Sequence, residues 1–248
     1  MQRKVACLVV FLSVAFFSQA LAAEGSQAKV TFISGNAIVE RSEVTTSQPL
    51  KLNDPLKAGD MVTTGKKSRL EITLPDGSLA RVDEGSTLTL TAMDFVPEKK
   101  RDIKIRVSMG KLWAKAAKLT GISGGFEVST HTMTAGVRGT VYRVNVNRDD
   151  SVLLKVYWGE VLVTGRPPAG AAQTPAGAPV MSEPAKVMGP VPVAGPSKVS
   201  MTEWTAIVTN MQQVKISPDG SISAPRSFDP IQDRDEWVRW NQSRDKLR

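Results

Sequence analysis

The run Arg69-Leu70-Glu71-Ile72-Thr73-Leu74, followed by Pro75-Asp76-Gly77-Ser78, decides the fold class of this 248-residue chain. Apolar and polar residues alternate strictly, so Leu70, Ile72 and Leu74 lie on one face of an extended strand. Such alternation gives a strand one buried face and one wet face, which is typical of antiparallel sheets packed into a sandwich or roll. The Pro, Asp, Gly and Ser residues that follow favour a tight turn.

The same alternation recurs on both sides of this stretch. It is found at residues 87–91, 103–107 and 142–146, and turn residues separate these runs. We place turns at residues 84–86, 109–111, 147–150 and 158–160. Many short strands at fairly even spacing predict a mainly β fold, an antiparallel sandwich or roll, over residues 29–164.

The N-terminus has the layout of a secretory signal. Arg3 and Lys4 precede an apolar run over residues 5–17, and the site Ala20-Leu21-Ala22 follows. We therefore predict a signal peptide over residues 1–22 and a periplasmic or otherwise extracytoplasmic location; an uncleaved anchor is the alternative. After cleavage, no other stretch is long and apolar enough for a membrane span.

The supply of reactive side chains is small, because the chain has one histidine and one cysteine. A zinc site needs three or four Cys or His ligands, a disulfide framework needs paired cysteines, and Ser-His-Asp chemistry would rest on His131 alone. Asp76, Asp83 and Glu84 could be an acid/base pair or calcium ligands, but they follow no calcium-loop spacing, and the Asp of the Asp76-Gly77-Ser78 turn is expected to hydrogen-bond its own backbone. We expect no enzyme, no metal and no cofactor, and we expect His131 to be an exposed side chain in a polar strand.

The C-terminal third differs in composition from the β region. Residues 165–198 hold eight of the fifteen prolines and many Ala and Gly residues, which predicts a linker or long loop. Within residues 199–248 we expect two short strands before a turn at 218–220. A helix should follow over residues 231–247, with Asp229 as its cap and Pro230 at its first position.

The predicted helix carries an aromatic stripe on one face. Trp237, Trp240 and Arg244 recur at helical spacing and share one face with Leu247. We expect this stripe to dock onto its own domain; insertion of the tryptophans into a partner is the alternative.

Several motifs of the β region occur in a specific order. They are Leu56-x-x-Gly59-Asp60, Asp76-Gly77-Ser78, Gly136-Val137-Arg138-Gly139-Thr140 and Tyr157-Trp158-Gly159-Glu160. In this order the chain resembles the FecR domain of bacterial envelope proteins over about residues 30–164. The residues that carry this structural signature are Gly59, Asp60, Asp76, Gly77, Gly136, Arg138, Gly139 and Thr140.

The resemblance implies a fold and a location more than an activity. The family is named for a regulator that relays the state of an outer-membrane iron-citrate receptor to a cytoplasmic sigma factor. That relay requires a cytoplasmic segment ahead of a membrane span, whereas four residues precede the apolar run here. We therefore expect the extracytoplasmic half alone, without direct control of a sigma factor.

The role of the Arg138-Gly139-Thr140 motif has two interpretations. Arg beside a permissive Gly can approach an anionic ligand. We prefer the alternative, in which Gly139 allows a tight turn and Thr140 opens the next strand.

The excess positive charge is concentrated in one segment. The full chain has a net charge of +8, and residues 98–118 alone carry eight basic and two acidic residues. We expect Lys104, Arg106, Lys111, Trp113 and Lys115 to form a cationic sheet face, with residues 109–111 as a turn between two strands. The alternative is a solvated face, with Trp113 turned into the core.

The predicted partner follows from this face. An aromatic among cations suits an anionic glycan, another anionic polymer or an acidic envelope protein. Nucleic acid is not expected, because of the export signal and the lack of interleaved aromatics. We therefore predict a non-catalytic envelope-binding module; the alternative is a periplasmic sensor that reports ligand state to a membrane partner.

Overall fold

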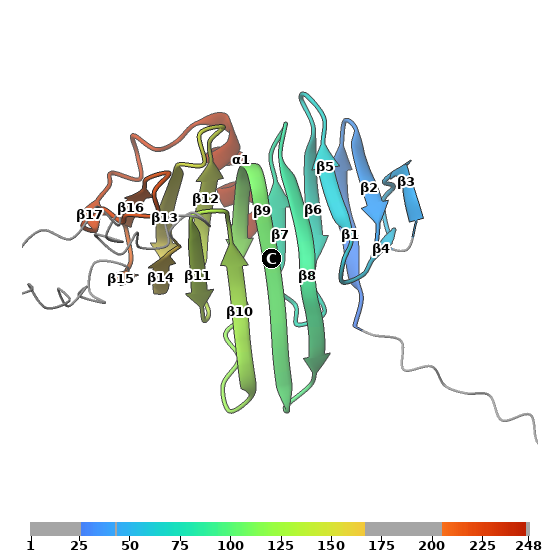
Figure 1. Ribbon diagram of the computed structural model, residues 1–248, viewed down its shortest axis with the longest axis horizontal. Coiled ribbons are helices and arrows are strands. Elements are labelled where there is room, and N and C mark those ends of the chain that lie inside the picture. The colour runs from blue at the N-terminus through green and yellow to red at the C-terminus, as the bar shows by residue number, and fades with distance from the viewer. Residues whose placement is uncertain (1–25, 43, 167–204, 247–248) are drawn as a thin grey trace, which may run out of the picture.

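The computed structural model describes residues 26–42, 44–166 and 205–246. The predicted signal peptide and nearly all of the predicted linker lie outside these residues. The described residues form seventeen strands and one helix. The strands follow one another along the long axis of the molecule, from β1–β5 at one end to β15–β17 at the other (Figure 1).

Hydrogen bonds connect all the strands, and the pairings divide them into two layers that share β9. Layer A contains, in spatial order, β4 (Pro55–Leu56), β1 (Ala28–Ser34), β6 (Arg69–Thr73), β7 (Leu79–Val82), β9 (Lys100–Lys115), β12 (Val141–Val146), β13 (Val152–Trp158), β16 (Gln212–Ile216) and β17 (Arg226–Ser227). Layer B contains β3 (Val44–Pro49), β2 (Ala37–Arg41), β5 (Met61–Thr64), β8 (Thr87–Val96), β9, β10 (Ser123–Ser129), β11 (Met133–Val137), β14 (Val161–Gly165) and β15 (Thr205–Val208). The predicted mainly β fold is confirmed.

The core lies between the inner faces of the two layers. The residues predicted to point inward, Leu70, Ile72, Leu74, Ile103, Ile105 and Val107, are all buried. They belong to one apolar cluster that also includes Val30, Leu90, Phe126 and Tyr142. Burying these side chains supplies the main driving force for folding.

Strand β9 differs from its prediction. Its first part pairs with β8 and β10 in layer B, and its last residues pair with β7 and β12 in layer A. The turn predicted at residues 109–111 is therefore wrong. Gly110 bends the strand with a φ of +89°, and the chain continues into the other layer instead of reversing.

One strand pair departs from the antiparallel pattern. β10 runs parallel to β9, from Ser123 opposite Lys100 to Ser129 opposite Arg106. The chain reaches this position through the connection at residues 116–122, which carries it back from the far end of β9. All other strand pairs in the described part of the chain are antiparallel.

The two short strands predicted near the C-terminus are confirmed. β15 pairs with β14 and β16 pairs with β13, so they extend both layers of the same β body. The turn predicted at residues 218–220 follows β16, with the Gly220 amide donating to the Ser217 carbonyl oxygen at 2.9 Å.

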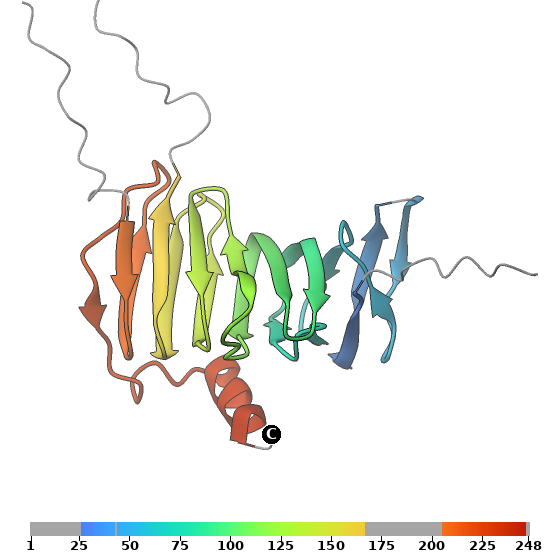
Figure 2. The same ribbon diagram turned by 90° about the horizontal axis from the view of Figure 1, so that it is seen from below.

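The C-terminal helix begins later than predicted. α1 spans Glu236–Lys246, and its cap is Asp235, whose Oδ1 accepts a hydrogen bond from the Val238 amide at 2.7 Å. Asp229 instead accepts from the Ile231 amide in a separate turn. α1 lies outside the strands on one side of the β body (Figure 2). In the described part of the chain no helix has the length and apolar character to cross a membrane.

Candidate binding site on the outer face of layer A

Cross-strand register arranges the outer face of layer A in rows that run across the strands. We call one set the middle row; it contains Glu71, Arg81, Trp113, Arg143 and Lys155. We call a second set the end row; it contains Thr73, Leu79, Lys115, Val141 and Trp158. Each of these residues lies two positions along its strand from the middle row, except Trp158, which lies three positions away because β13 has a bulge. Side chains two apart on a strand share a face, so both rows point away from the core.

Helix α1 covers the middle row. Trp113 is 1% exposed, and its Nε1 donates to Asp245 Oδ2 at 3.1 Å. Its ring lies 4.5 Å from that of Tyr157, in a cluster with the helix residues Trp237 and Val238. The expectation that the helical stripe docks onto its own domain is confirmed for Trp237, Trp240 and Arg244, whereas Leu247 lies outside the described residues. Trp113 is thus turned away from the core, yet the helix keeps it from solvent.

The centre of this interface is a buried ion-paired network. Arg81 and Glu71 are both 0% exposed, and Arg81 Nε donates to Glu71 Oε2 at 2.7 Å. From the helix, Arg244 donates to both Glu71 oxygens at 3.1 and 3.2 Å, and Asp245 Oδ1 accepts from Arg81 at 2.8 Å. Burial opposes ionisation, but the hydrogen bonds from Arg244, Arg81 and Thr31 outweigh it and lower the pKa of Glu71 to about 2.

A second polar contact fastens the segment that leads into the helix. Asp233 accepts hydrogen bonds from Arg143 at 2.8 Å, Lys155 at 2.7 Å and the Tyr157 hydroxyl at 2.5 Å. Although burial opposes it, bonding to these donors lowers the pKa of Asp233, whereas burial raises the pKa of Tyr157. These side chains hold the C-terminal segment in place, and their hydrogen bonds to one another leave them less available to a ligand.

The end row lies beside this cover and forms an open hollow of about 450 Å³. We call it the Trp158 groove; its lining residues are Thr73, Gly77, Leu79, Lys115, Ala116, Ala117, Lys118, Gly139, Thr140, Val141 and Trp158. Trp158 is 56% exposed, although large aromatic side chains usually bury most of their surface. The groove is therefore lined in part by an exposed indole ring.

Backbone geometry at the Arg138-Gly139-Thr140 motif shapes this groove. Gly139 has a φ of +61°, and a Cβ there would lie 2.7 Å from the Lys118 Cβ, so only glycine lets these segments approach. Thr140 Oγ1 donates to the Glu160 carbonyl oxygen at 2.9 Å. Arg138 is exposed and donates to the Leu119 carbonyl oxygen at 3.0 Å. The interpretation of this motif as a tight turn agrees with these contacts.

The Asp76-Gly77-Ser78 turn supports the groove from the other side. Asp76 accepts from the Ser78 amide and hydroxyl, and Ser78 Oγ accepts from the Ala117 amide at 2.9 Å. Arg101 Nε lies 2.9 Å from Asp76 Oδ2, so this buried carboxylate is paired. The expected role of Asp76 in holding its own turn agrees with these bonds.

The groove is positively charged. Lys115 and Lys118 make no ion pair within the described residues, and none of the residues lining the groove is acidic. An anion could therefore bind here without displacing an existing salt bridge.

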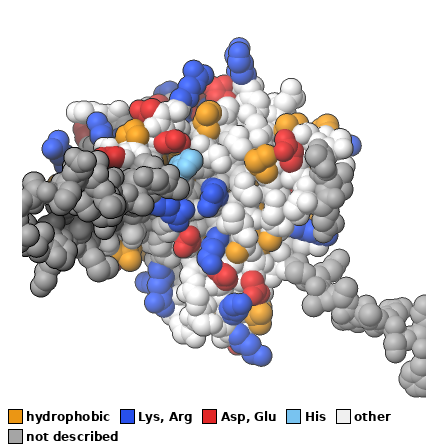
Figure 3. Space-filling model, viewed as in Figure 1, with side chains coloured by type: hydrophobic (Ala, Val, Ile, Leu, Met, Phe, Trp, Pro, Cys, Tyr) orange, Lys and Arg blue, Asp and Glu red, His pale blue; other side chains and the backbone are white. Residues whose placement is uncertain are grey.

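The five residues predicted to form one cationic face are not brought together. Lys104 and Arg106 lie on the outer face of layer B, where Lys104 Nζ is 3.2 Å from Asp102. Trp113 lies under α1, and Lys115 lines the Trp158 groove. Figure 3 shows the face opposite α1, where basic and acidic side chains are interspersed.

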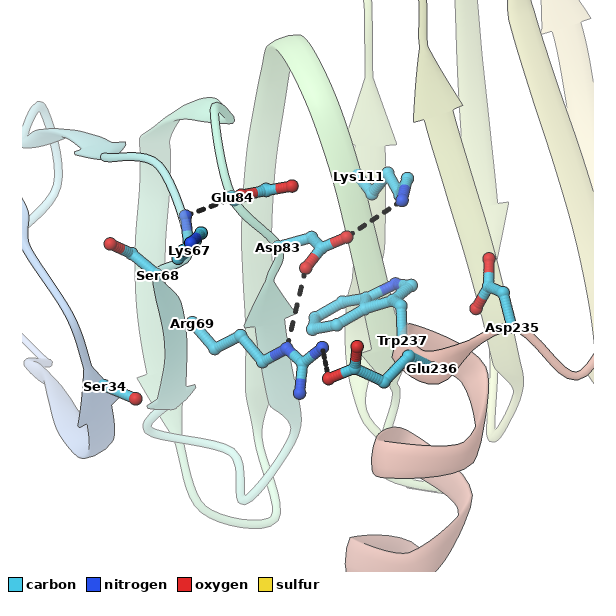
Figure 4. A pocket seen from close by; sticks show the side chains of 10 residues that line it. All are labelled: Ser34, Lys67, Ser68, Arg69, Asp83, Glu84, Lys111, Asp235, Glu236 and Trp237. Atoms are coloured by element: carbon cyan, nitrogen blue, oxygen red, sulfur yellow. Dashed lines mark hydrogen bonds and ion pairs between the residues drawn. The ribbon is translucent and has the colours of Figure 1, made fainter.

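Lys111 belongs to a separate charged pocket of about 580 Å³ beside the start of α1 (Figure 4). Lys111 Nζ lies 2.9 Å from Asp83, and Arg69 lies 2.8 Å from Glu236 and 3.7 Å from Asp83. The Lys67 amide donates to Glu84. Because these charges neutralise one another, we place the candidate site in the Trp158 groove.

The remaining predicted residues lie elsewhere. Asp60 accepts from Arg41 and from the Lys57 amide, both at 2.8 Å, and the preceding Gly59 has a φ of +91°. Gly136 lies in β11 of layer B, where nothing is within 4 Å of an added Cβ. The exposed His131 lies in a bend between β10 and β11, so its predicted position in a strand is wrong. No cluster of His, Cys, Asp or Glu suited to a metal ion occurs among the described residues.

Two groove residues were missed as candidate binding residues from the sequence. Trp158 was interpreted as part of a turn, and Lys118 was counted only in the charge of its segment. Strict alternation would place Trp158 on the same face as the buried Val156. A bulge in β13 instead places the adjacent Tyr157 and Trp158 both outside the core, so alternation does not predict the exposure of Trp158. Lys118 lies beyond the end of β9, where no strand pattern sets its direction.

Two solved structures are similar to part of this chain. Two crystal structures, at 1.65 and 2.50 Å resolution, of a Parabacteroides distasonis ATCC 8503 protein provisionally described as an anti-sigma factor are similar at 15% identity and a TM-score of 0.44. The similarity covers 68% of this chain and 60% of theirs, so this chain spans less than two thirds of their length. No curated protein matches.

The family comparison identifies the central part of the β body. Residues 60–162 match the FecR protein family, which lies inside the region expected from the motifs. This range includes the Asp76-Gly77-Ser78 turn, the Arg138-Gly139-Thr140 motif and Trp158. The sequence resemblance to the FecR domain is thus confirmed over residues 60–162.

Proposed function

We propose that this protein is a non-catalytic extracytoplasmic module that binds an envelope protein or an anionic polymer in the Trp158 groove. The observation that carries this proposal is that an exposed Trp158 lines one open hollow together with Lys115 and Lys118, which make no ion pair in the part of the chain that the structure describes. The signal-like N-terminus supports the extracytoplasmic location.

The arrangement of the other charged groups favours this groove over the rest of the molecule. Lys104 and Lys111 each lie beside an acidic partner, and Arg81 and Arg143 are buried under the C-terminal segment. Trp113 is engaged by α1. Aromatic and cationic side chains available to a ligand therefore coincide in the groove.

Charge reversal on two faces tests this proposal. The variant K115E/K118E should recover much less of any envelope component captured by crosslinking in whole cells, and the loss should be greatest at low salt. The matched control K104E/R106E makes the same charge change on layer B and should leave capture unchanged. Equal losses in both variants, or a loss only in K104E/R106E, would contradict the proposed site.

A second candidate function is that of a periplasmic sensor component reporting ligand state to a membrane partner. The FecR family match supports it, as does the position of α1 beside the groove, where aromatic contacts and ion pairs hold the helix. A neighbouring gene for a sigma factor or a receptor should then exist, and deleting this protein should change transcription under that sigma factor. Unchanged transcription would argue for the binding module alone.

A further inference from the structure

We propose that the occupant of the Trp158 groove is an acidic polysaccharide, stacked by one sugar ring on Trp158 and held by its carboxylates or phosphates on Lys115 and Lys118. This inference rests on the proposed function and specifies its ligand. It is argued from the shape of the groove, the exposed ring and the position of the charges.

The shape of the groove suits a narrow ligand better than the surface of a folded protein. Its volume of about 450 Å³ is that of a small-molecule site. Its lining includes Gly77, Ala116, Ala117 and Gly139, which project little or nothing above the backbone. A specific protein interface needs about 800 Å² on each partner, which extends well beyond such a hollow.

The exposed ring suits a sugar. The Trp158 side chain offers a flat apolar surface in a wet groove, and its indole N–H can donate a hydrogen bond. The C–H groups on one face of a pyranose ring form a matching flat apolar surface, while its hydroxyls stay in water. Thr73 lies at the opposite end of the same row, where its hydroxyl shares a hydrogen bond with the Thr31 hydroxyl at 3.0 Å.

The position of the charges favours an acidic ligand. Lys115 lies two strands from Trp158 in the end row, a separation of about 10 Å at normal strand spacing. Lys118, whose Cβ and Cγ pack close to Gly139, adds a second lysine to the groove lining, and it too has no ion pair among the described residues. A ligand reaching from the ring to these lysines therefore extends across at least three strands. A polymer that carries regular negative charge meets both conditions.

Calorimetric titration of the purified protein with defined polymers tests the inference. Polygalacturonate should bind, and neutral dextran should not. Raising NaCl from about 0.1 M to about 1 M, which shortens the Debye length from about 10 Å to about 3 Å, should weaken the binding strongly. We expect W158A to weaken it about tenfold at either salt concentration, because it removes the stacking surface.

Variants at the lysines separate charge from stacking. K115Q/K118Q should weaken binding about tenfold at low salt and remove most of its salt dependence. The matched control K104Q/R106Q should stay within about twofold of the unchanged protein, since it alters the same charge on the other layer. Circular dichroism should show the same β signal in all variants, because each changed side chain is partly or fully exposed.

Several results would overturn the inference. They are absence of polygalacturonate binding, equal binding of poly-L-glutamate, or an unchanged affinity in W158A. The proposed function is tested separately. If polygalacturonate does not bind but K115E/K118E still abolishes capture of an envelope component in cells, the groove is a binding site whose occupant is not a polysaccharide. If capture is also unaffected, both proposals fail.

Discussion

Two tryptophans on the outer side of layer A show how strongly the solvent exposure of a residue depends on its row. Trp113 and Trp158 both point away from the core, yet Trp113 is 1% exposed and Trp158 is 56% exposed. Trp113 lies in the middle row under α1, and Trp158 lies in the end row beyond it. A residue type therefore predicts the chemistry available at these positions, whereas the row decides whether a ligand can reach it.

Glu71 gives the clearest prediction at this scale. Its folded-state pKa of about 2 lies below its ordinary value of 4.5, so its ionised form stabilises the protein fully above about pH 4.5. That stabilisation is lost as the pH falls from about 4.5 to about 2. Glu71→Gln should reduce the free energy of unfolding by about 3 kcal/mol near neutral pH, since it leaves Arg81 buried without its charged partner.

Urea unfolding across pH 2–7 checks this prediction. The difference between the unchanged protein and Glu71→Gln should shrink toward pH 2, where Glu71 becomes protonated and resembles glutamine. Glu160→Gln is the matched control, because Glu160 is exposed, and it should change stability by less than about 0.5 kcal/mol at any pH. A difference for Glu71→Gln that does not vary with pH would contradict the assigned pKa.

At the scale of elements, β9 organises the molecule. It belongs to both layers, and the bend at Gly110 changes its partners from β8 and β10 to β7 and β12. Lys104 and Arg106 before the bend thus face solvent on layer B, while Lys111, Trp113 and Lys115 after it lie on the outside of layer A. A single strand carries its basic residues to opposite sides of the protein.

Gly110→Ala tests the bend. The residue has a φ of +89°, and an added Cβ would overlap the side chain of Ser86. We expect a loss of about 2–4 kcal/mol in the free energy of unfolding, from backbone strain and steric overlap. Gly136→Ala, in open space within β11, should stay within about 1 kcal/mol of the unchanged protein. Equal effects in the two variants on chemical denaturation would show that the bend carries no special constraint.

The start of α1 provides a second prediction at this scale. Asp235→Ala removes the oxygen that accepts from the Val238 amide and should destabilise the helix by about 1 kcal/mol. Hydrogen exchange in residues 236–246 should accelerate accordingly. Asp229→Ala, at the position favoured by the sequence pattern, should leave exchange in α1 nearly unchanged, because Asp229 bonds a turn before the helix. Faster exchange in Asp229→Ala alone would place the functional cap there.

At the scale of the whole molecule, two layers and one helix give the protein two different outer faces. Layer B leaves its outer face to solvent around Lys104 and Arg106, whereas layer A carries α1 across its middle row (Figures 1 and 2). The contacts of α1 with the outer face of layer A are largely aromatic and ionic. Because the apolar core between the layers includes no residue of α1, we predict a separation of the two, in which the β core keeps its fold when this cover is removed.

Ending the chain after residue 227 tests this separation. The far-ultraviolet circular dichroism should keep its β signal, since the apolar core between the layers includes no residue of α1. The melting temperature should fall, and 8-anilinonaphthalenesulfonate should bind the uncovered Trp113 and Tyr157 surface. A shortened chain with unchanged dye binding would contradict the described cover, and complete loss of β structure would contradict the separation.

Much of the β fold and the family could be predicted from the sequence. Alternation identified β6, β12 and the core-facing side of β9, because neighbouring residues on a strand point to opposite faces whatever the partner strand is. The helical stripe with Trp237 and Trp240 likewise predicted the docking of α1. The ordered motifs indicated the FecR domain, which the family match confirms over residues 60–162.

The candidate site could be predicted only in part. The residue order already places cationic and aromatic side chains between residues 98 and 118, and Lys115 is the predicted binding residue that lies in the groove. The covering of Trp113 by α1 and the meeting of Lys115 with Trp158 appear only in the folded protein. Alternation is a local property of a strand, whereas the row that a residue joins depends on the register of distant strands and on the passage of β9 between layers at Gly110.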